Sequence, residues 1–133
     1  MRPEKTDLKY VWDMLDAART VVELVQGRTL HDYENTKWLR LAVERSIEII
    51  GEAARKVSDA FRNEQSAIPW SAIIVTRHII SQEYGDIQND KMWRIATIHV
   101  PALLPQLEPI IDANPPASPS APAEQTSEEP DPS

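Results

Sequence analysis

The feature that most constrains the fold is a long apolar stripe with helical spacing between Thr36 and Asn63. Its apolar side chains recur every three or four residues: Leu39, Val43, Ile47, Ile50, Ala54, Val57 and Phe61. Residues at this spacing lie on one face of an α-helix, whereas a half-buried strand would alternate apolar and polar residues. Ala42, Ile49 and Ala53 widen the face beyond the roughly 100° that one packing partner covers. We therefore expect a central helix over 36–63.

A second stripe of the same kind precedes it. From Asp7 to Gln26 apolar side chains again recur at three and four residues: Leu8, Val11, Trp12, Leu15, Ala18, Val22 and Val25. Gly27 follows directly, and glycine readily adopts the left-handed conformation that ends many helices. The sequence predicts a first helix that stops at Gly27, then a connector over 29–35 with room for one helical turn.

Prolines and capping residues divide the second half of the chain. We expect a third helix with Ser66 as its cap and Pro69 in its first turn, ending at Gln82 or Tyr84 before Gly85 and Asp86.

A fourth helix, capped by Asn89 or Asp90, should run through 92–98, and Pro101 should break it before a last short helix over 103–111. The sum is an all-α fold, an antiparallel bundle of four main helices plus short helices.

The chain changes character after Asn114. Residues 115–133 hold six of the 11 prolines, among Ala, Ser and Glu. Such a composition cannot bury enough apolar surface to offset the entropy of ordering the chain. We expect one helical domain over 1–114 and a disordered Pro-rich tail over 115–133.

Composition excludes several classes of protein. With no cysteine among 133 residues, disulfide frameworks, thiolate zinc sites and cysteine nucleophiles are ruled out, and a reducing cytoplasm is the expected location. The charged start and the absence of any run near the roughly 20 apolar residues of a membrane span argue against secretion and membrane insertion.

The net charge of −7 is unevenly placed, because the tail carries Glu124, Glu128, Glu129 and Asp131 and no cation. The helical part is therefore only mildly acidic. A protein that binds nucleic acid by bulk phosphate attraction would be strongly basic, so any action on nucleic acid here needs a local site.

Polar side chains converge on the predicted third helix. At 100° per residue Arg77, Ser81 and Tyr84 fall within about 40° of one another, and His78 and Gln82 form the adjoining strip. Arginine suits a phosphate because its planar fork gives two parallel hydrogen bonds, and histidine moves protons near neutrality. The alternative interpretation of this strip is an ordinary ion-pairing surface.

Other candidates favour structural roles. His31 and His99 have no supporting carboxylates, so neither a metal site nor a cofactor is predicted. Glu44, Glu48 and Glu52 form a row typical of a solvated helix face. The four tryptophans are most simply core and interface anchors: Trp12, Trp38, Trp70 and Trp93.

Several segments together resemble the HepT-like toxins, a branch of the HEPN superfamily. They are Ile49-Ile50-Gly51-Glu52-Ala53-Ala54-Arg55-Lys56, then Ile68-Pro69-Trp70, then Ile73-Ile74 before Arg77, then Glu83-Tyr84, and Trp93. The resemblance covers about residues 7–112. It implies a homodimer whose paired third helices form a cleft, ribonuclease activity without a metal, and a small MNT-type nucleotidyltransferase antitoxin as partner. A homodimer is also favoured by the wide apolar arc over 36–63 and by Leu41 on its polar side.

The family motif reads Arg, a polar residue, three further positions, His, any residue, Tyr. Arg77 and Tyr84 match it, His78 takes the polar position, and Gln82 stands where the histidine belongs. The resemblance implies that the arginine neutralises the scissile phosphate, that the histidine handles a proton, and that the tyrosine is adenylylated by the antitoxin. Glutamine cannot exchange a proton at pH 7.

Two functions follow, and one less specific role stays open. In the first, a toxin ribonuclease uses Arg77 as phosphate clamp and His78 as substitute acid or base, while Gln82 and Tyr84 orient RNA, with Ser81 and Glu83 in support. In the second, a catalytically degenerate dimer binds the nucleotidyltransferase without cleaving RNA. The third is a helical dimerisation module unrelated to RNA, which the lack of a basic patch keeps open.

Overall fold

The computed structural model describes residues 4–82 and 85–115, apart from the side chains of Arg77, Ser81 and Gln82. Throughout these ranges the regular structure is helical and no strand is present, as expected. The predicted tail lies outside the described residues from residue 116 onward. None of the helices in these ranges is long and apolar enough to cross a membrane.

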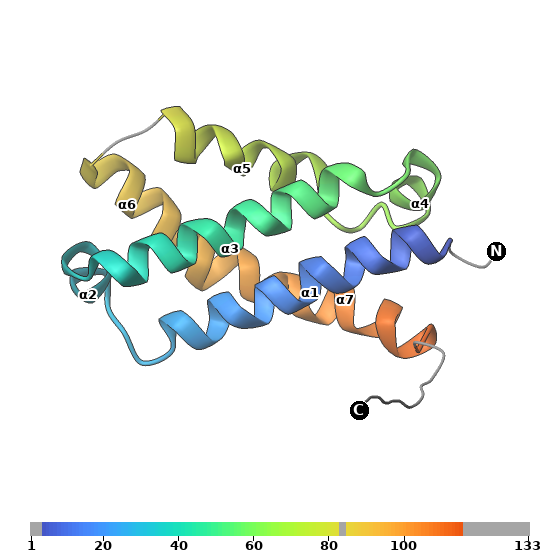
Figure 1. Ribbon diagram of the computed structural model, residues 1–133, viewed down its shortest axis with the longest axis horizontal. Coiled ribbons are helices and arrows are strands. Elements are labelled where there is room, and N and C mark those ends of the chain that lie inside the picture. The colour runs from blue at the N-terminus through green and yellow to red at the C-terminus, as the bar shows by residue number, and fades with distance from the viewer. Residues whose placement is uncertain (1–3, 83–84, 116–133) are drawn as a thin grey trace, which may run out of the picture.

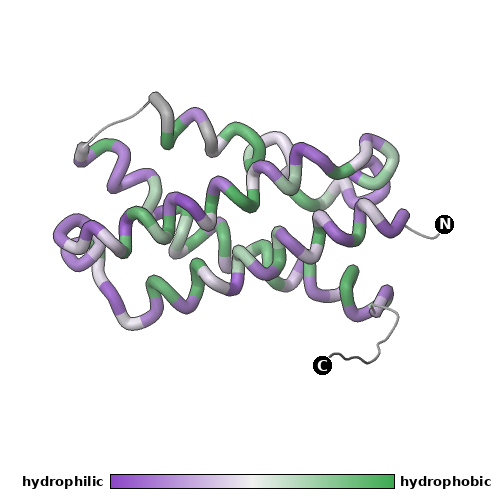
Figure 2. Tube along the Cα trace, viewed as in Figure 1, coloured by the Kyte–Doolittle hydropathy of each residue, from purple (hydrophilic) through white to green (hydrophobic). Residues whose placement is uncertain are grey.

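Two long antiparallel helices form the centre of the molecule, α1 (Lys5–Val25) and α3 (Lys37–Lys56) (Figure 1). The short α2 (Leu30–Asn35) connects them. α7 (Val100–Ala113) packs on α1, and α5 (Trp70–Gln82) packs on α3, so these four helices make the predicted bundle. Figure 2 shows green apolar residues alternating with purple polar ones along each helix, because each helix buries only one face.

The turn between α1 and α2 matches its prediction. Gly27 has φ of 73°, the left-handed conformation that favours glycine. A capping box then starts α2, since the Asp32 amide donates to the Thr29 hydroxyl at 3.1 Å and the Thr29 amide donates to the Asp32 carboxylate at 2.9 Å. The connector therefore holds a capped helix.

The predicted single helix over 36–63 is wrong. α3 ends at Lys56, and α4 (Asp59–Glu64) begins after Ser58, whose hydroxyl accepts from the Phe61 amide at 3.2 Å. Val57 and Phe61 are nevertheless buried. The apolar pattern is thus satisfied by two helices, because a serine N-cap offers the backbone an alternative that periodicity does not reveal.

Ser66 is not the cap of the third helix. α5 begins at Trp70, and the Pro69 carbonyl accepts the first bond, from the Ile73 amide at 3.0 Å. The Trp70 indole fixes this start by donating to the Gln65 carbonyl at 3.0 Å. Aromatic packing and a backbone acceptor therefore replace the expected cap.

The predicted start and break in the last third are also wrong. α6 (Gly85–Arg94) already contains Asn89 and Asp90, so neither residue caps it. The helix then passes through one π-helical segment, η1 (Ile95–His99), directly into α7, and Pro101 does not interrupt it. A proline lacks an amide and clashes with the carbonyl four residues earlier, and the wider π turn relieves both conflicts.

Candidate functional site

α5 carries the predicted site on its C-terminal half. Its start is held by Trp70, which packs edge-on against Phe61 with ring centroids 6.3 Å apart. Its far end is held by Gln88 of α6, whose amide donates to the Ile80 carbonyl at 3.0 Å. Ile73, buried, packs the helix on α3. α5 is therefore held at its start and at Ile80, within its C-terminal half.

The structure describes the predicted site residues to different extents. The backbones of Arg77, Ser81 and Gln82 lie in α5, but their side chains are outside what the structure describes. Glu83 and Tyr84 lie outside the described residues altogether. His78 is exposed on α5. The convergence of these side chains on one strip therefore stays a prediction.

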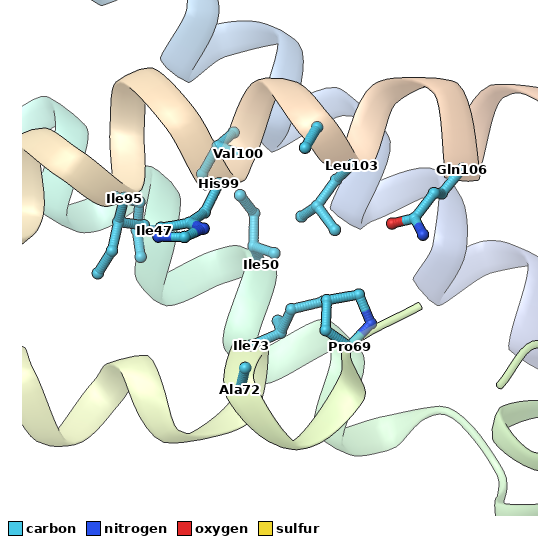
Figure 3. A pocket seen from close by; sticks show the side chains of 11 residues that line it. Ile47, Ile50, Pro69, Ala72, Ile73, Ile95, His99, Val100, Leu103 and Gln106 are labelled. Carbon is cyan, nitrogen blue, oxygen red and sulfur yellow. The ribbon is translucent and has the colours of Figure 1, made fainter. Parts of the chain in front are cut away.

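Beside α5 lies an apolar groove of about 310 Å³. Its floor is α3, one wall is the first half of α5, and the other wall is η1 with α7 (Figure 3). The lining side chains are Ile47, Ile50, Pro69, Ala72, Ile73, Ile95, His99, Val100, Ala102, Leu103 and Gln106. None of these carries a permanent charge, so the groove suits an apolar partner.

The two elements that form the walls each carry a further exposed apolar side chain that does not line the groove. Val75 of α5 is 51% exposed and Ile98 of η1 is 58% exposed. The groove was not predicted from the sequence, although one feature of the sequence indicates it. The α5 segment is apolar on most of its circumference, and a helix of that kind is normally covered on more than one side.

The wide arc of α3, in contrast, is covered within the chain. Most of its apolar residues are buried between α1 and α5. Leu41 stays 54% exposed on the opposite side. The arc by itself therefore gives no support for a dimer.

The buried Tyr33 and the partly buried Glu44 lie where α2, α3 and α6 meet. The Tyr33 side chain is fully buried against Trp93, with ring centroids 5.5 Å apart, and its hydroxyl has no hydrogen-bond partner among the described residues. Burial raises the pKa of Tyr33 far above its ordinary value. Partial burial also raises the pKa of Glu44, so the prediction that Glu44 lies on a fully solvated face is wrong.

The remaining candidates behave as surface or packing residues. His31 is exposed and His99 lines the groove, and no group of three potential metal ligands occurs in the described ranges. Trp70 is buried, as an anchor should be. Trp12 and Trp38 are about half exposed, and each lies beneath an arginine: Arg19 at 5.9 Å and Arg28 at 5.2 Å.

Comparison with known proteins decides the family. A family model described as "Ribonuclease HepT-like" matches residues 14–110, a span that runs from α1 to α7 and includes α5 and the groove. The chain belongs to this HepT-like family. The predicted family is therefore confirmed, together with the all-α fold expected from it.

Named relatives agree with this membership. "Putative RNase MJ1380" of Methanocaldococcus jannaschii is 32% identical over 78% of this chain and 96% of its own length. "Putative RNase TTE0752" of Caldanaerobacter subterraneus is 30% identical over 80% of this chain and 96% of its own. "Probable ribonuclease HepT" of Thermococcus cleftensis is 25% identical over 74% of this chain and 90% of its own. No solved structure gives a significant match.

Proposed function

We propose that this HepT-like protein is a toxin endoribonuclease that cleaves RNA without a metal, in a cleft between two copies of the chain, and that a nucleotidyltransferase antitoxin silences it. The observation that carries the proposal is the family match over 14–110, because that span contains the α5 segment with Arg77 and His78. The names of the relatives support the same activity.

The apolar groove supports the dimer. Soluble monomers rarely leave large contiguous apolar surfaces exposed, and such patches usually mark interfaces. The groove between α5 and η1 has no permanent charge in its lining, and the same two elements expose Val75 and Ile98. In a two-fold arrangement each copy would insert these side chains into the groove of the other. The α5 helices of the two copies would then face each other.

The chemistry assigned to α5 follows from its residue types. Arg77 would bind the scissile phosphate with two parallel hydrogen bonds and a charge that does not titrate. Gln82 can orient RNA but cannot carry a proton, so His78, one turn earlier on the adjoining strip, would move the proton. Ser81 and Glu83 would support the site.

Tyr84 would be the point of control. Transfer of AMP from ATP to the phenol oxygen forms a phosphodiester bond, and pyrophosphate and the phenol proton are released. The added phosphate would then compete with RNA phosphate for Arg77 and fill the cleft.

Gln82 favours a second candidate function, a degenerate dimer that binds the nucleotidyltransferase without cleaving RNA. Loss of positioned acid-base help typically lowers a rate by about 10² to 10⁴. If His78 does not compensate, the surviving role is partner binding.

Cleavage of RNA by the purified chain in the presence of a chelator tests the proposal. We expect slow cleavage by the unmodified chain and none by Arg77→Ala. Arg55→Ala, on the exposed side of α3, is the matched control and should cleave like the unmodified chain. No cleavage by the unmodified chain, together with a stable complex with the nucleotidyltransferase, would establish the second function instead.

A further inference from the structure

Among the arginines whose side chains the structure describes, Arg94 alone has no partner among the described residues. Four others form ion pairs with carboxylates: Arg19, Arg45, Arg55 and Arg62. Arg28 and Arg40 donate to backbone carbonyls at 2.9 and 2.6 Å. Arg94 is exposed and makes no hydrogen bond or ion pair with any described residue. Even Asp90, one turn earlier, forms no ion pair with it.

Arg94 does not have the usual structural role of an arginine near the end of a helix. Arginine near the end of a helix normally interacts with the free carbonyls of the last turn. Arg94, however, has helical dihedral angles of −64° and −43°, and the helix continues through η1 into α7. Arg94 is therefore not at a helix end, so helix capping does not explain it.

Arg94 lies on the helix that follows the proposed site in the chain. α6 begins at Gly85, directly after the segment that holds Gln82 and Tyr84, and Arg94 lies about 13 Å farther along the helix axis. Lys91 is exposed one turn earlier, and at helical spacing it shares one face with Arg94 and the exposed Ile87. Lys91 and Arg94 thus lie on one exposed face of α6.

We propose that Arg94 binds a backbone phosphate of single-stranded RNA that extends out of the α5 site. The inference rests on the proposed function, because the RNA is its substrate. Arginine is the side chain best suited to bidentate phosphate contacts, and an arginine without an internal partner loses no ion pair when it binds one. In a chain with a net charge of −7, such a cation provides the local site that binding requires.

Fluorescence anisotropy with a labelled 2′-O-methyl oligoribonucleotide tests this role, because that probe lacks the attacking hydroxyl and is not cleaved. We expect Arg94→Glu to weaken binding by ten-fold or more and Arg94→Lys by less. Lys9→Glu is the control, since it makes the same charge change on α1, at an exposed cation in a surface pair with Asp13 at 3.4 Å. Asp90→Asn should tighten binding two- to three-fold.

The salt dependence supplies a second readout. For single strands log K changes by about 0.7 per unit of log salt for each phosphate neutralised, so Arg94→Gln should lower the slope by about that amount. Equal binding by Arg94→Glu and Lys9→Glu, with RNA cleavage by the unmodified chain intact, would overturn the role of Arg94 and leave the proposed function standing. Loss of nucleotidyltransferase binding, with RNA binding unchanged, would reassign Arg94 to a protein interface. Absence of RNA binding by the unmodified chain would overturn both proposals.

Discussion

The carboxylate of Asp7 holds Ser58 with both of its oxygens. One oxygen accepts from the Ser58 amide at 2.8 Å, and the other accepts from the Ser58 hydroxyl at 2.7 Å. Asp7 is 5% exposed, although it belongs to the first turn of α1. A contact across 51 residues therefore fixes the point where α3 ends and α4 begins.

Removing this contact should cost a substantial part of the stability. Asp7→Ala leaves the Ser58 amide without its acceptor, and we expect a loss of about 1 to 3 kcal/mol in the free energy of unfolding. Ser58→Ala removes the cap of α4 and should cost about 1 kcal/mol. Urea unfolding followed by tryptophan fluorescence measures both. Asp13→Ala breaks an exposed ion pair and should cost less than about 1 kcal/mol. Additive effects of the Asp7 and Ser58 changes would contradict a direct coupling.

The apolar groove predicts the site of self-association. Val75→Glu and Ile98→Glu place charges at exposed positions of α5 and η1, the elements beside the groove, and burying an unpaired charge is strongly unfavourable. Each should turn a dimer into a monomer at micromolar concentration in light scattering. Leu41→Glu is the control, because Leu41 is equally exposed on another face of the chain. A dimer that is lost with Leu41→Glu and kept with the other two would place the interface on the outer side of α3.

Restoring the missing proton carrier should raise activity. Gln82→His supplies an imidazole at the position where the family motif has histidine, so we expect RNA cleavage and toxicity to rise ten-fold or more. Gel analysis of labelled RNA measures the rate. If the unmodified chain and Gln82→His cleave equally and His78→Ala abolishes cleavage, then His78 has taken over the role.

Adenylylation by the neighbouring nucleotidyltransferase should be confined to Tyr84. Tyr33 is fully buried and cannot enter another active site, and Tyr10 is partly buried with Lys9 and Lys56 within 5.1 and 5.8 Å of its ring. We expect mass spectrometry of the co-expressed protein to find AMP increments on Tyr84, and Tyr84→Phe to abolish them. AMP on Tyr10, or a tight complex without modification, would contradict this.

Glu44 should make stability depend on pH. Burial raises its pKa in the folded state, so the folded protein binds more protons than the unfolded chain, and stability falls as pH rises from the unfolded to the folded pKa. Glu44→Gln removes the partly buried charge. It should increase the urea midpoint slightly at pH 7 and leave it unchanged below about pH 3, where the carboxyl is protonated in both states. Glu23→Gln, on the exposed face of α1, should change neither. An equal gain at both pH values would point to packing instead of charge.

Local sequence determined the helical class, the family and most helix positions. Apolar residues at three- and four-residue spacing require a helix wherever they occur, so α1, α3 and the burial of Val57 and Phe61 followed directly. Gly27 likewise ended α1, because the turn needs a positive φ. These features depend on neighbours within a few residues.

Tertiary structure decided the features that depend on distant partners. The break at Ser58 needs the carboxylate of Asp7, and the start of α5 needs the Trp70 indole to meet Gln65. Pro101 stays helical because η1 widens the turn before it. The groove arises from the distance between α5 and η1, which is set by the packing of α5 on α3 and of η1 on α1. Periodicity says which face of a helix is apolar, but only packing decides how much of that face a neighbour covers.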